Sequence, residues 1–347
     1  MPGASGVDVD HLTDRHPSVT PERLVAGLVP PPTFSDVSFD TYRPDPAEPS
    51  QTAAVQACRD FCAQAVQRRA GKKKLFGRRE VLPGVGVYLD GGFGVGKTHL
   101  LASTYYDLAA AQAGPAAFAT FGELTQLAGV FGFVECIELL SDYVVVCIDE
   151  FELDDPGNTT LISRLLSALV ERGVSIAATS NTLPEQLGEG RFAAQDFLRE
   201  INTLAKMFIT VRIEGPDYRH RDLPPAPVPP SDDEVRAEAA DVPDATLDDF
   251  DALCAHLATM HPSRYLALIE GVAEVFITGV HPLDDQNVAL RLVSLTDRLY
   301  DAGIPVVASG AKLDTVFSEE MLTGGFRKKY LRATSRLLAL TAAGRPG

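Results

Sequence analysis

The stretch YLDGGFGVGKTHLLAS, residues 88–103, decides the fold of this chain. It holds the pattern G-x-x-x-x-G-K-[ST], in which Gly91 and Gly96 are the fixed glycines and Lys97 and Thr98 follow. The apolar run VGVYLD before the loop predicts a short strand, and THLLASTYYDLAAAQA after it predicts a helix. A glycine-rich loop between a strand and a helix is the arrangement of a phosphate-binding loop, the Walker A motif.

The residue types of this loop suit the phosphates of ATP. Glycines let backbone N–H groups turn inward, and the N-terminus of the following helix adds the positive end of its dipole. We expect Lys97 to reach the β- and γ-phosphates and the Thr98 hydroxyl to hold Mg²⁺. The predicted nucleotide-binding residues are those of the loop, its first helical turn and one upstream aromatic residue: Gly91, Gly92, Phe93, Gly94, Val95, Gly96, Lys97, Thr98, His99 and Tyr42.

A second apolar strand, YVVVCIDEF at residues 143–151, ends in two adjacent carboxylates. Acids at the end of a buried strand are costly unless a cation or a proton compensates them. A neighbouring phosphate-binding loop would supply that cation. We therefore expect Asp149 to hold Mg²⁺ through water, and Glu150 to orient and deprotonate the attacking water, as a Walker B pair does.

A third strand, VSIAATSN at residues 174–181, ends in Asn181. In NTPases of the AAA+ class, a polar residue at this place contacts the γ-phosphate and the attacking water. The alternative is a helix cap or turn residue before residues 182–184. The order of loop, acids and asparagine on three strands fits the AAA+ arrangement better than that of small GTPases. Because the sequence contains no N-K-x-D element that would read guanine, ATP is the expected nucleotide.

AAA+ proteins complete their site with an arginine from a neighbouring subunit, which stabilises charge in the transition state. Arg191 and Arg199, in the segment 188–200 before the strand FITVRI, are the candidates for this catalytic role. Arg332 and Arg336 could instead contact phosphate or a neighbouring subunit; the alternative is that most of the five basic residues between Arg327 and Arg336 form a solvated helix face. We therefore also predict a homo-oligomer in which one subunit supplies an arginine finger in trans to the site of its neighbour.

From residue 84 onward, short apolar runs alternate with helical stretches, which predicts a three-layer α/β domain with a mostly parallel sheet. The segment 274–310 repeats the strand, turn, helix, glycine and strand of 143–181, but it has Gly279 and Val280 opposite the two acids. We therefore expect a single nucleotide site. The expected organisation is a flexible N-terminal arm at 1–35, an AAA+-like ATP-binding domain at 36–225, an acidic and proline-rich linker at 226–246, and a smaller C-terminal α/β unit at 247–347.

The formal net charge of −16 argues against broad non-specific affinity for nucleic acid or for anionic membranes. One basic segment, QRRAGKKKLFGRRE at residues 67–80, is either a solvated loop or a contact for an acidic partner or for nucleic acid. No run approaches the roughly 18 apolar residues that a membrane span needs. The N-terminus has no signal pattern, so a cytoplasmic location is expected. The cysteines and histidines show no metal-ligand spacing, so no catalytic metal other than Mg²⁺ is expected.

The chain resembles the ZapE-type ATPases, bacterial cell-division proteins with mitochondrial relatives. DYRHR and LTDRLYDAGI are the more specific of the matching stretches, which together extend over residues 35–340. The matching stretches are YLDGGFGVGKTHLL, CIDEFELDD, VSIAATSNTLPEQL, GPDYRHRDL, VFITGVHPLDDQN, RLVSLTDRLYDAGIPVVAS and TSRLLAL.

The resemblance implies an AAA+-like ATPase that lacks the usual all-helical lid and acts on division or quality-control proteins. In bacteria the implied partner is FtsZ, the tubulin-like ring protein. The segment 39–55 resembles the adenine-side segment of such ATPases, where Tyr42 and Gln51 either contact the base or pack. The family commonly has G-L-Q-R before F-L-P-A-I, whereas this chain has GEGRFAAQDFLREI, so Arg191 is displaced by several residues.

Two other classes of protein compete with this interpretation. A nucleic-acid AAA+ module of the helicase-loader or initiator type would carry GVGKTHLL equally well. The acidic net charge disfavours it, as does the lack of a helix-turn-helix or of an aromatic and basic pattern after residue 225. A nucleotide-gated scaffold without turnover is disfavoured by the intact Asp149 and Glu150 pair.

Overall fold

The computed structural model of this protein describes residues 9–18, 20–73, 79–80, 82–92, 94–151, 156–184, 198–216 and 228–343. Contacts along the chain divide it into two compact units. The larger unit comprises Thr20–Pro30 and Phe34–Tyr218. The smaller unit comprises Met1–Val19, Pro31–Thr33 and Arg219–Gly347, so the N-terminal stretch contributes to both.

The larger unit is built on a five-stranded sheet in the order β4-β5-β6-β3-β7, with every neighbouring pair parallel. Strand β6 lies between β3 and β5, which brings the carboxyl ends of these three strands to one edge of the sheet. The strands are β3 (Gly86–Gly91), β4 (Ala116–Thr120), β5 (Val145–Asp149), β6 (Ser175–Ser180) and β7 (Ile209–Ile213).

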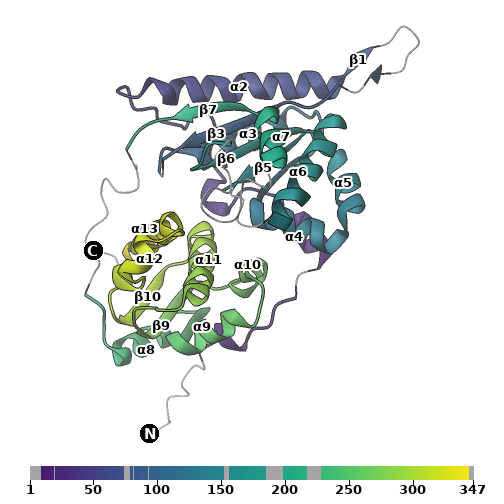
Figure 1. Ribbon diagram of the computed structural model, residues 1–347. Helices are drawn as coiled ribbons and strands as arrows, with labels where there is room; N and C mark the ends of the chain where they lie inside the picture. The colour runs from purple at the N-terminus through teal and green to yellow at the C-terminus, as the bar shows by residue number, and fades with distance from the viewer. Residues whose placement is uncertain are drawn as a thin grey trace. The chain divides into compact units, whose positions relative to one another are not determined.

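Helices cover both faces of this sheet, because the side chains of a strand alternate between its two faces. Along β5, Val145 and Cys147 pack in a core cluster with residues of α2 and α3, whereas Val146 and Ile148 pack in a cluster with residues of α4, α5, α6 and α7. Figure 1 shows α2 running alongside the sheet, with the short antiparallel pair β1 and β2 at its C-terminal end. The elements are α1 (Pro21–Ala26), α2 (Pro49–Ala70), β1 (Lys72–Lys73), β2 (Arg79–Glu80), α3 (Lys97–Ala110), α4 (Phe121–Phe131), α5 (Phe133–Ser141), α6 (Pro156–Glu171) and α7 (Leu198–Met207).

The smaller unit contains a three-stranded parallel sheet in the order β10-β9-β8. The strands and helices are α8 (Asp232–Asp241), β8 (Ala245–Asp249), α9 (Phe250–Ala258), α10 (Tyr265–Leu268), β9 (Glu274–Val280), α11 (Gln286–Ala302), β10 (Val306–Gly310), α12 (Glu319–Thr323) and α13 (Arg327–Ala343). Short 3₁₀ helices occur at η1 (Leu12–Asp14), η2 (Pro32–Phe34), η6 (Pro262–Arg264) and η7 (Leu313–Thr315).

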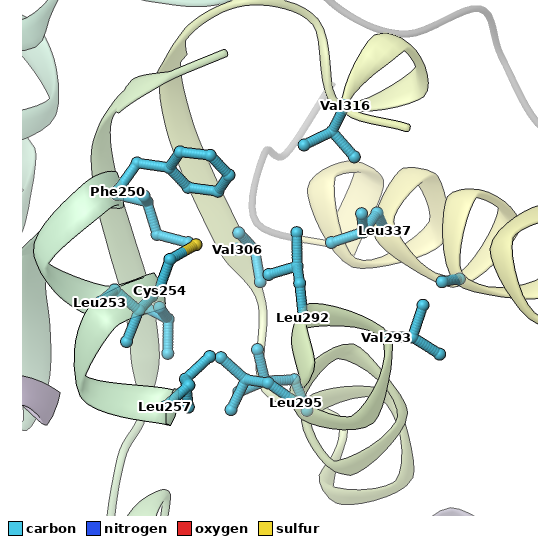
Figure 2. Packing of buried hydrophobic residues seen from close by; sticks show 14 of the residues in the cluster. Phe250, Leu253, Cys254, Leu257, Leu292, Val293, Leu295, Val306, Val316 and Leu337 are labelled. Carbon is cyan, nitrogen blue, oxygen red and sulfur yellow. The ribbon is translucent and has the colours of Figure 1, made fainter. Parts of the chain in front are cut away.

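This unit has its own hydrophobic core. Figure 2 shows side chains of α9, α11, α13 and β10 pointing toward one another: Phe250, Cys254, Leu257, Leu292, Leu295, Val306 and Leu337. The predicted fold class, a three-layer parallel α/β domain followed by a smaller α/β unit, is therefore confirmed.

Parts of the stretches expected as a flexible arm and as a linker are packed elements in the structure. Within residues 1–35, Asp10 forms a parallel bridge with Thr246 of β8, and Leu12 is fully buried. Within residues 226–246, the acidic run forms α8, and a capping box between Ser231 and Glu234 starts this helix. Acidic residues in a first helical turn also favour the helix through its dipole. The acidic composition alone does not distinguish such a helix start from a linker.

Among the residues that the structure describes, no single helix is long and apolar enough to cross a membrane. The helices α4 and α5 reach that length and composition only when taken together, and the pair is bent by 116°.

Candidate functional site

The loop between β3 and α3 lies where backbone elements approach one another closely. A Cβ atom on Gly91 would lie 2.3 Å from the carbonyl oxygen of Ile213 in β7. Gly96, the N-cap of α3, has a φ of +87°, and a Cβ there would lie 2.5 Å from Cε2 of Tyr42. Glycine is the residue that meets both conditions without strain.

The Lys97 ammonium joins the loop to the strand at the centre of the sheet. Its Nζ donates to the carbonyl oxygens of Gly91 and Gly92, at 3.0 and 2.6 Å, and to Oδ1 of Asn181 at 2.7 Å. Asn181 directly follows β6, which pairs in parallel with β3. The structure thus brings together the loop, its lysine and the predicted polar residue of the third strand.

The hydroxyl and carboxylate expected to hold Mg²⁺ are in contact. Thr98 Oγ1 lies 3.1 Å from Oδ2 of Asp149 and 3.3 Å from its Oδ1. Asp149 ends β5 and is 7% exposed. Hydroxyl, carboxylate and phosphate oxygens are the ligands that Mg²⁺ takes, and it binds through few protein ligands. The pair fits such an ion. In the described ranges there is no group of three or more His, Cys, Asp or Glu side chains suited to a metal.

Glu150 has an unusual backbone conformation. Its φ is +54°, in the left-handed region that a residue with a Cβ seldom adopts. Its N–H donates to Oγ1 of Thr179 at 3.1 Å, and the N–H of Phe151 donates to the Thr179 carbonyl at 2.7 Å. Strain of this kind persists where the surroundings hold it, often at functional sites.

Thr179 also donates its hydroxyl hydrogen to Oδ1 of Asp149. It is not among the residues that the motifs indicate. A signal for it exists in the sequence, because it lies two residues before Asn181 on a strand that could neighbour the acidic one. The strand order needed to use that signal comes only from the structure.

Tyr42 packs against the loop and stabilises it. Its hydroxyl donates to the Val95 carbonyl at 2.7 Å, and its ring makes an edge contact with His99, with ring centroids 5.5 Å apart. Burial raises the pKa of Tyr42 to about 12, so the phenol keeps its proton and remains a donor at neutral pH. His99 is held by the Ser38 carbonyl and the Thr41 hydroxyl, at 3.0 and 3.1 Å.

Both amide atoms of Gln51 are used within the protein. Its Oε1 accepts from the Asp45 N–H at 2.8 Å, and its Nε2 donates to the Glu214 carbonyl at 2.9 Å. Gln51 therefore links α2 to the segment after β7, which favours the packing alternative over a contact with the base.

The arginines differ in position. Arg199 is exposed near the start of α7. Arg191 and Phe93 lie outside the described residues. Arg332 and Arg336 are buried and both bind Asp297, so these two side chains serve the interior of the smaller unit. The idea that they reach phosphate or a neighbour is wrong for this reason.

The parallel sheet carries a glycine-rich loop after β3. A lysine, an asparagine and a threonine–aspartate pair lie at the same edge of this sheet. Together these features define a P-loop nucleotide-binding protein of the AAA+ type. The profile of the AFG1-like ATPase family matches residues 18–244 and 233–345. The chain belongs to this family.

The relatives agree with that assignment. The cell division protein ZapE of Escherichia coli K12 is 27% identical over 277 residues, which cover 68% of this chain and 74% of that protein. Lactation elevated protein 1 homolog B of Danio rerio is 30% identical over 95 residues, 27% of this chain and 19% of that protein. The predicted resemblance to ZapE-type ATPases is confirmed.

Among solved structures, domain III of the Thermotoga maritima replication initiation protein DnaA is 18% identical with a TM-score of 0.40. The match covers 54% of this chain and 69% of that chain. A likeness of this degree has no bearing on function.

Proposed function

We propose that this protein hydrolyses ATP in a Mg²⁺-dependent reaction at the loop Gly91–Thr98 and uses the reaction to act on a protein partner. The observation that carries the proposal is the contact of Lys97 with Asn181 beside the Thr98 and Asp149 pair. Membership of the AFG1-like ATPase family supports it independently.

The loop binds the phosphates of ATP. Helix α3 is 14 residues long and begins at Lys97, so its first N–H groups and the positive end of its dipole face the loop. The Lys97 ammonium donates hydrogen bonds to the carbonyl oxygens of Gly91 and Gly92. Phosphate oxygens are stronger partners for this charge than carbonyl oxygens are.

The chemical step uses residues at the ends of three strands. The Thr98 hydroxyl and the Asp149 carboxylate would hold Mg²⁺, which would supply charge neutralisation at the phosphates. Glu150 takes the proton of the attacking water as general base. Asn181 positions that water and the γ-phosphate, and its contact with Lys97 keeps it beside the loop.

Steady-state ATPase activity tests the site. Glu150→Gln keeps the shape of the side chain but removes the base, so we expect ATP binding to remain and turnover to fall roughly 10²–10⁴-fold. Lys97→Ala should instead weaken nucleotide binding itself, because the loop loses its cation. Undiminished hydrolysis by Glu150→Gln would contradict the assigned role of Glu150.

We propose FtsZ as the first partner to test and the cytoplasm as the location. The relationship to the cell division protein ZapE supports this choice. The ATPase assay is repeated with polymerised FtsZ and then with duplex DNA in its place. Stimulation by FtsZ that disappears in Glu150→Gln supports a division ATPase. Stimulation by DNA alone would overturn the protein partner and leave the ATP site standing.

We also propose a homo-oligomer in which an arginine acts on the site of a neighbouring subunit. Arg199 is the candidate within the described residues, and its exposure supports this role; Arg191 remains the second candidate. Mixing Arg199→Ala with Glu150→Gln in the same assay tests the idea. Recovery of activity on mixing is expected, because one subunit then supplies the base and its neighbour the arginine.

A further inference from the structure

We propose that Thr179 is a positioning residue that sets both acids at the end of β5. This inference rests on the proposed ATPase function, in which Asp149 holds Mg²⁺ and Glu150 activates water. Thr179 touches neither the nucleotide nor the water in this proposal. It acts through the two acids.

The Thr179 hydroxyl serves two consecutive residues of the neighbouring strand end. It donates its hydrogen to Oδ1 of Asp149, and a lone pair accepts the N–H of Glu150 at 3.1 Å. A hydroxyl has one hydrogen to donate, so the single donor of Thr179 is committed to Asp149. Thr179 is 2% exposed, and no bulk water competes with these bonds.

The two bonds fix the conformation that the acids need. Strands β5 and β6 pair in parallel up to Ile148 and Ala178, and just beyond that point Glu150 turns into the left-handed region at φ +54°. A left-handed residue with a Cβ is strained and requires support from its surroundings. Thr179 gives it, because its side chain holds the Glu150 N–H and its carbonyl accepts the next N–H, that of Phe151, at 2.7 Å.

Asp149 is held from two sides. Thr98, at the start of α3, donates to the carboxylate from the loop side, and Thr179 donates from the sheet side. The carboxylate is therefore oriented before any ion arrives, which lowers the cost of ordering it when Mg²⁺ binds.

An ordinary buried threonine behaves differently. Thr104 of α3 is 1% exposed, and its hydroxyl donates to the Leu100 carbonyl of its own helix at 2.9 Å. That bond satisfies a buried polar atom without linking the helix to an acid of the site. Thr104 thus provides a matched control for the loss of a buried hydroxyl in the same unit.

Kinetics of Thr179→Val, Thr179→Ser and Thr104→Val form the first test. Valine keeps the shape and removes both bonds, so we expect kcat to fall roughly 10–100-fold while KM for ATP changes little, since Lys97 and the loop are intact. Serine keeps the hydroxyl and should restore most of the turnover. Thr104→Val should turn over as the wild type does. A serine variant as slow as the valine variant would refute the role of the hydroxyl.

Binding of a fluorescent ATP analogue, in EDTA and across a Mg²⁺ titration, forms the second test. Thr179→Val should bind the analogue as the wild type does in EDTA. It should need a higher Mg²⁺ concentration than the wild type to reach half of the Mg²⁺-dependent change in binding. The same Mg²⁺ dependence in both proteins, together with equal kcat, would overturn the proposal. If the wild type itself failed to hydrolyse ATP, the proposed function would fall, and the Mg²⁺ titration would still decide whether Thr179 positions Asp149.

Discussion

Two glycines of the loop are needed for different reasons. Gly91 lies against the Ile213 carbonyl of β7, and Gly96 combines a left-handed φ with the close approach of the Tyr42 ring. A Cβ on Gly92 would meet nothing within 4 Å. The motif fixes Gly91 and Gly96 but leaves Gly92 variable, and the physical demand for glycine follows the same division.

Gly96→Ala should therefore lower the stability of the larger unit. The left-handed φ alone costs about 1–2 kcal/mol for a residue with a Cβ, and the contact with Tyr42 adds to it. Gly92→Ala, the matched control, should unfold at nearly the wild-type denaturant concentration. Equal destabilisation of the two variants in a urea titration would show that crowding at Gly96 is not what limits this position.

At the scale of elements, α11 and α13 are joined by a buried charge cluster. Asp297 of α11 accepts from Arg332 at 2.6 Å and from Arg336 of the same helix, and Arg336 also lies over the ring of Tyr300. Burial alone would raise the pKa of Asp297, but the two guanidinium groups outweigh it and hold the pKa below the usual value. The side of α13 that carries Arg332 and Arg336 therefore packs inside the smaller unit.

Asp297→Asn should strongly destabilise the smaller unit, by about 3–5 kcal/mol, because two buried guanidinium groups lose their counter-charge. Asp233→Asn, at an exposed pair with Arg236, should change little. Because the native pKa of Asp297 is lowered, its stabilising effect is present above pH 3.8 and is lost as the pH falls through the native pKa. Chemical denaturation at neutral and acid pH measures both effects; a tolerated Asp297→Asn would contradict the cluster's role.

At the scale of the whole molecule, the N-terminal stretch belongs to both units. The Asp10 carbonyl accepts from Leu247 at the edge of the smaller sheet, and the Leu28 carbonyl accepts from Phe118 on β4, an edge strand of the larger sheet, each at 2.9 Å. Both edges thereby gain a hydrogen-bonding partner from the same stretch. The smaller unit is therefore discontinuous in sequence, with residues 9–18 and Pro31–Thr33 added to its C-terminal part.

Asp248 anchors this stretch to the smaller unit. Its carboxylate, 3% exposed, accepts from the N–H groups of Leu12 and Thr13 at 3.0 and 3.1 Å and from the Thr13 hydroxyl at 2.9 Å. Asp248→Asn should cost about 1–3 kcal/mol, since a buried acceptor is lost, and should speed hydrogen exchange in β8. The exposed Asp241→Asn is the control. Unchanged exchange in β8 would show that the anchor is dispensable.

The sequence by itself determined the fold class, the family and the parts of the site that local patterns encode. The strand, loop and helix around Gly91–Thr98 follow from residues adjacent in the chain. Asp149, Glu150 and Asn181 were predictable because parallel strands end at one edge of their sheet, so polar residues at strand ends converge. Their catalytic roles remain predictions that the proposed experiments test.

Only the tertiary structure decided which residues support that site and which segments of the chain form the smaller unit. Thr179 reaches the acids across 29 and 30 residues of sequence, Tyr42 reaches Val95 across 53, and Asp248 reaches Thr13 across 235. These contacts depend on strand order and on the path of the N-terminal stretch. No local periodicity encodes them, because their energy arises only when distant backbone and side-chain groups are buried together.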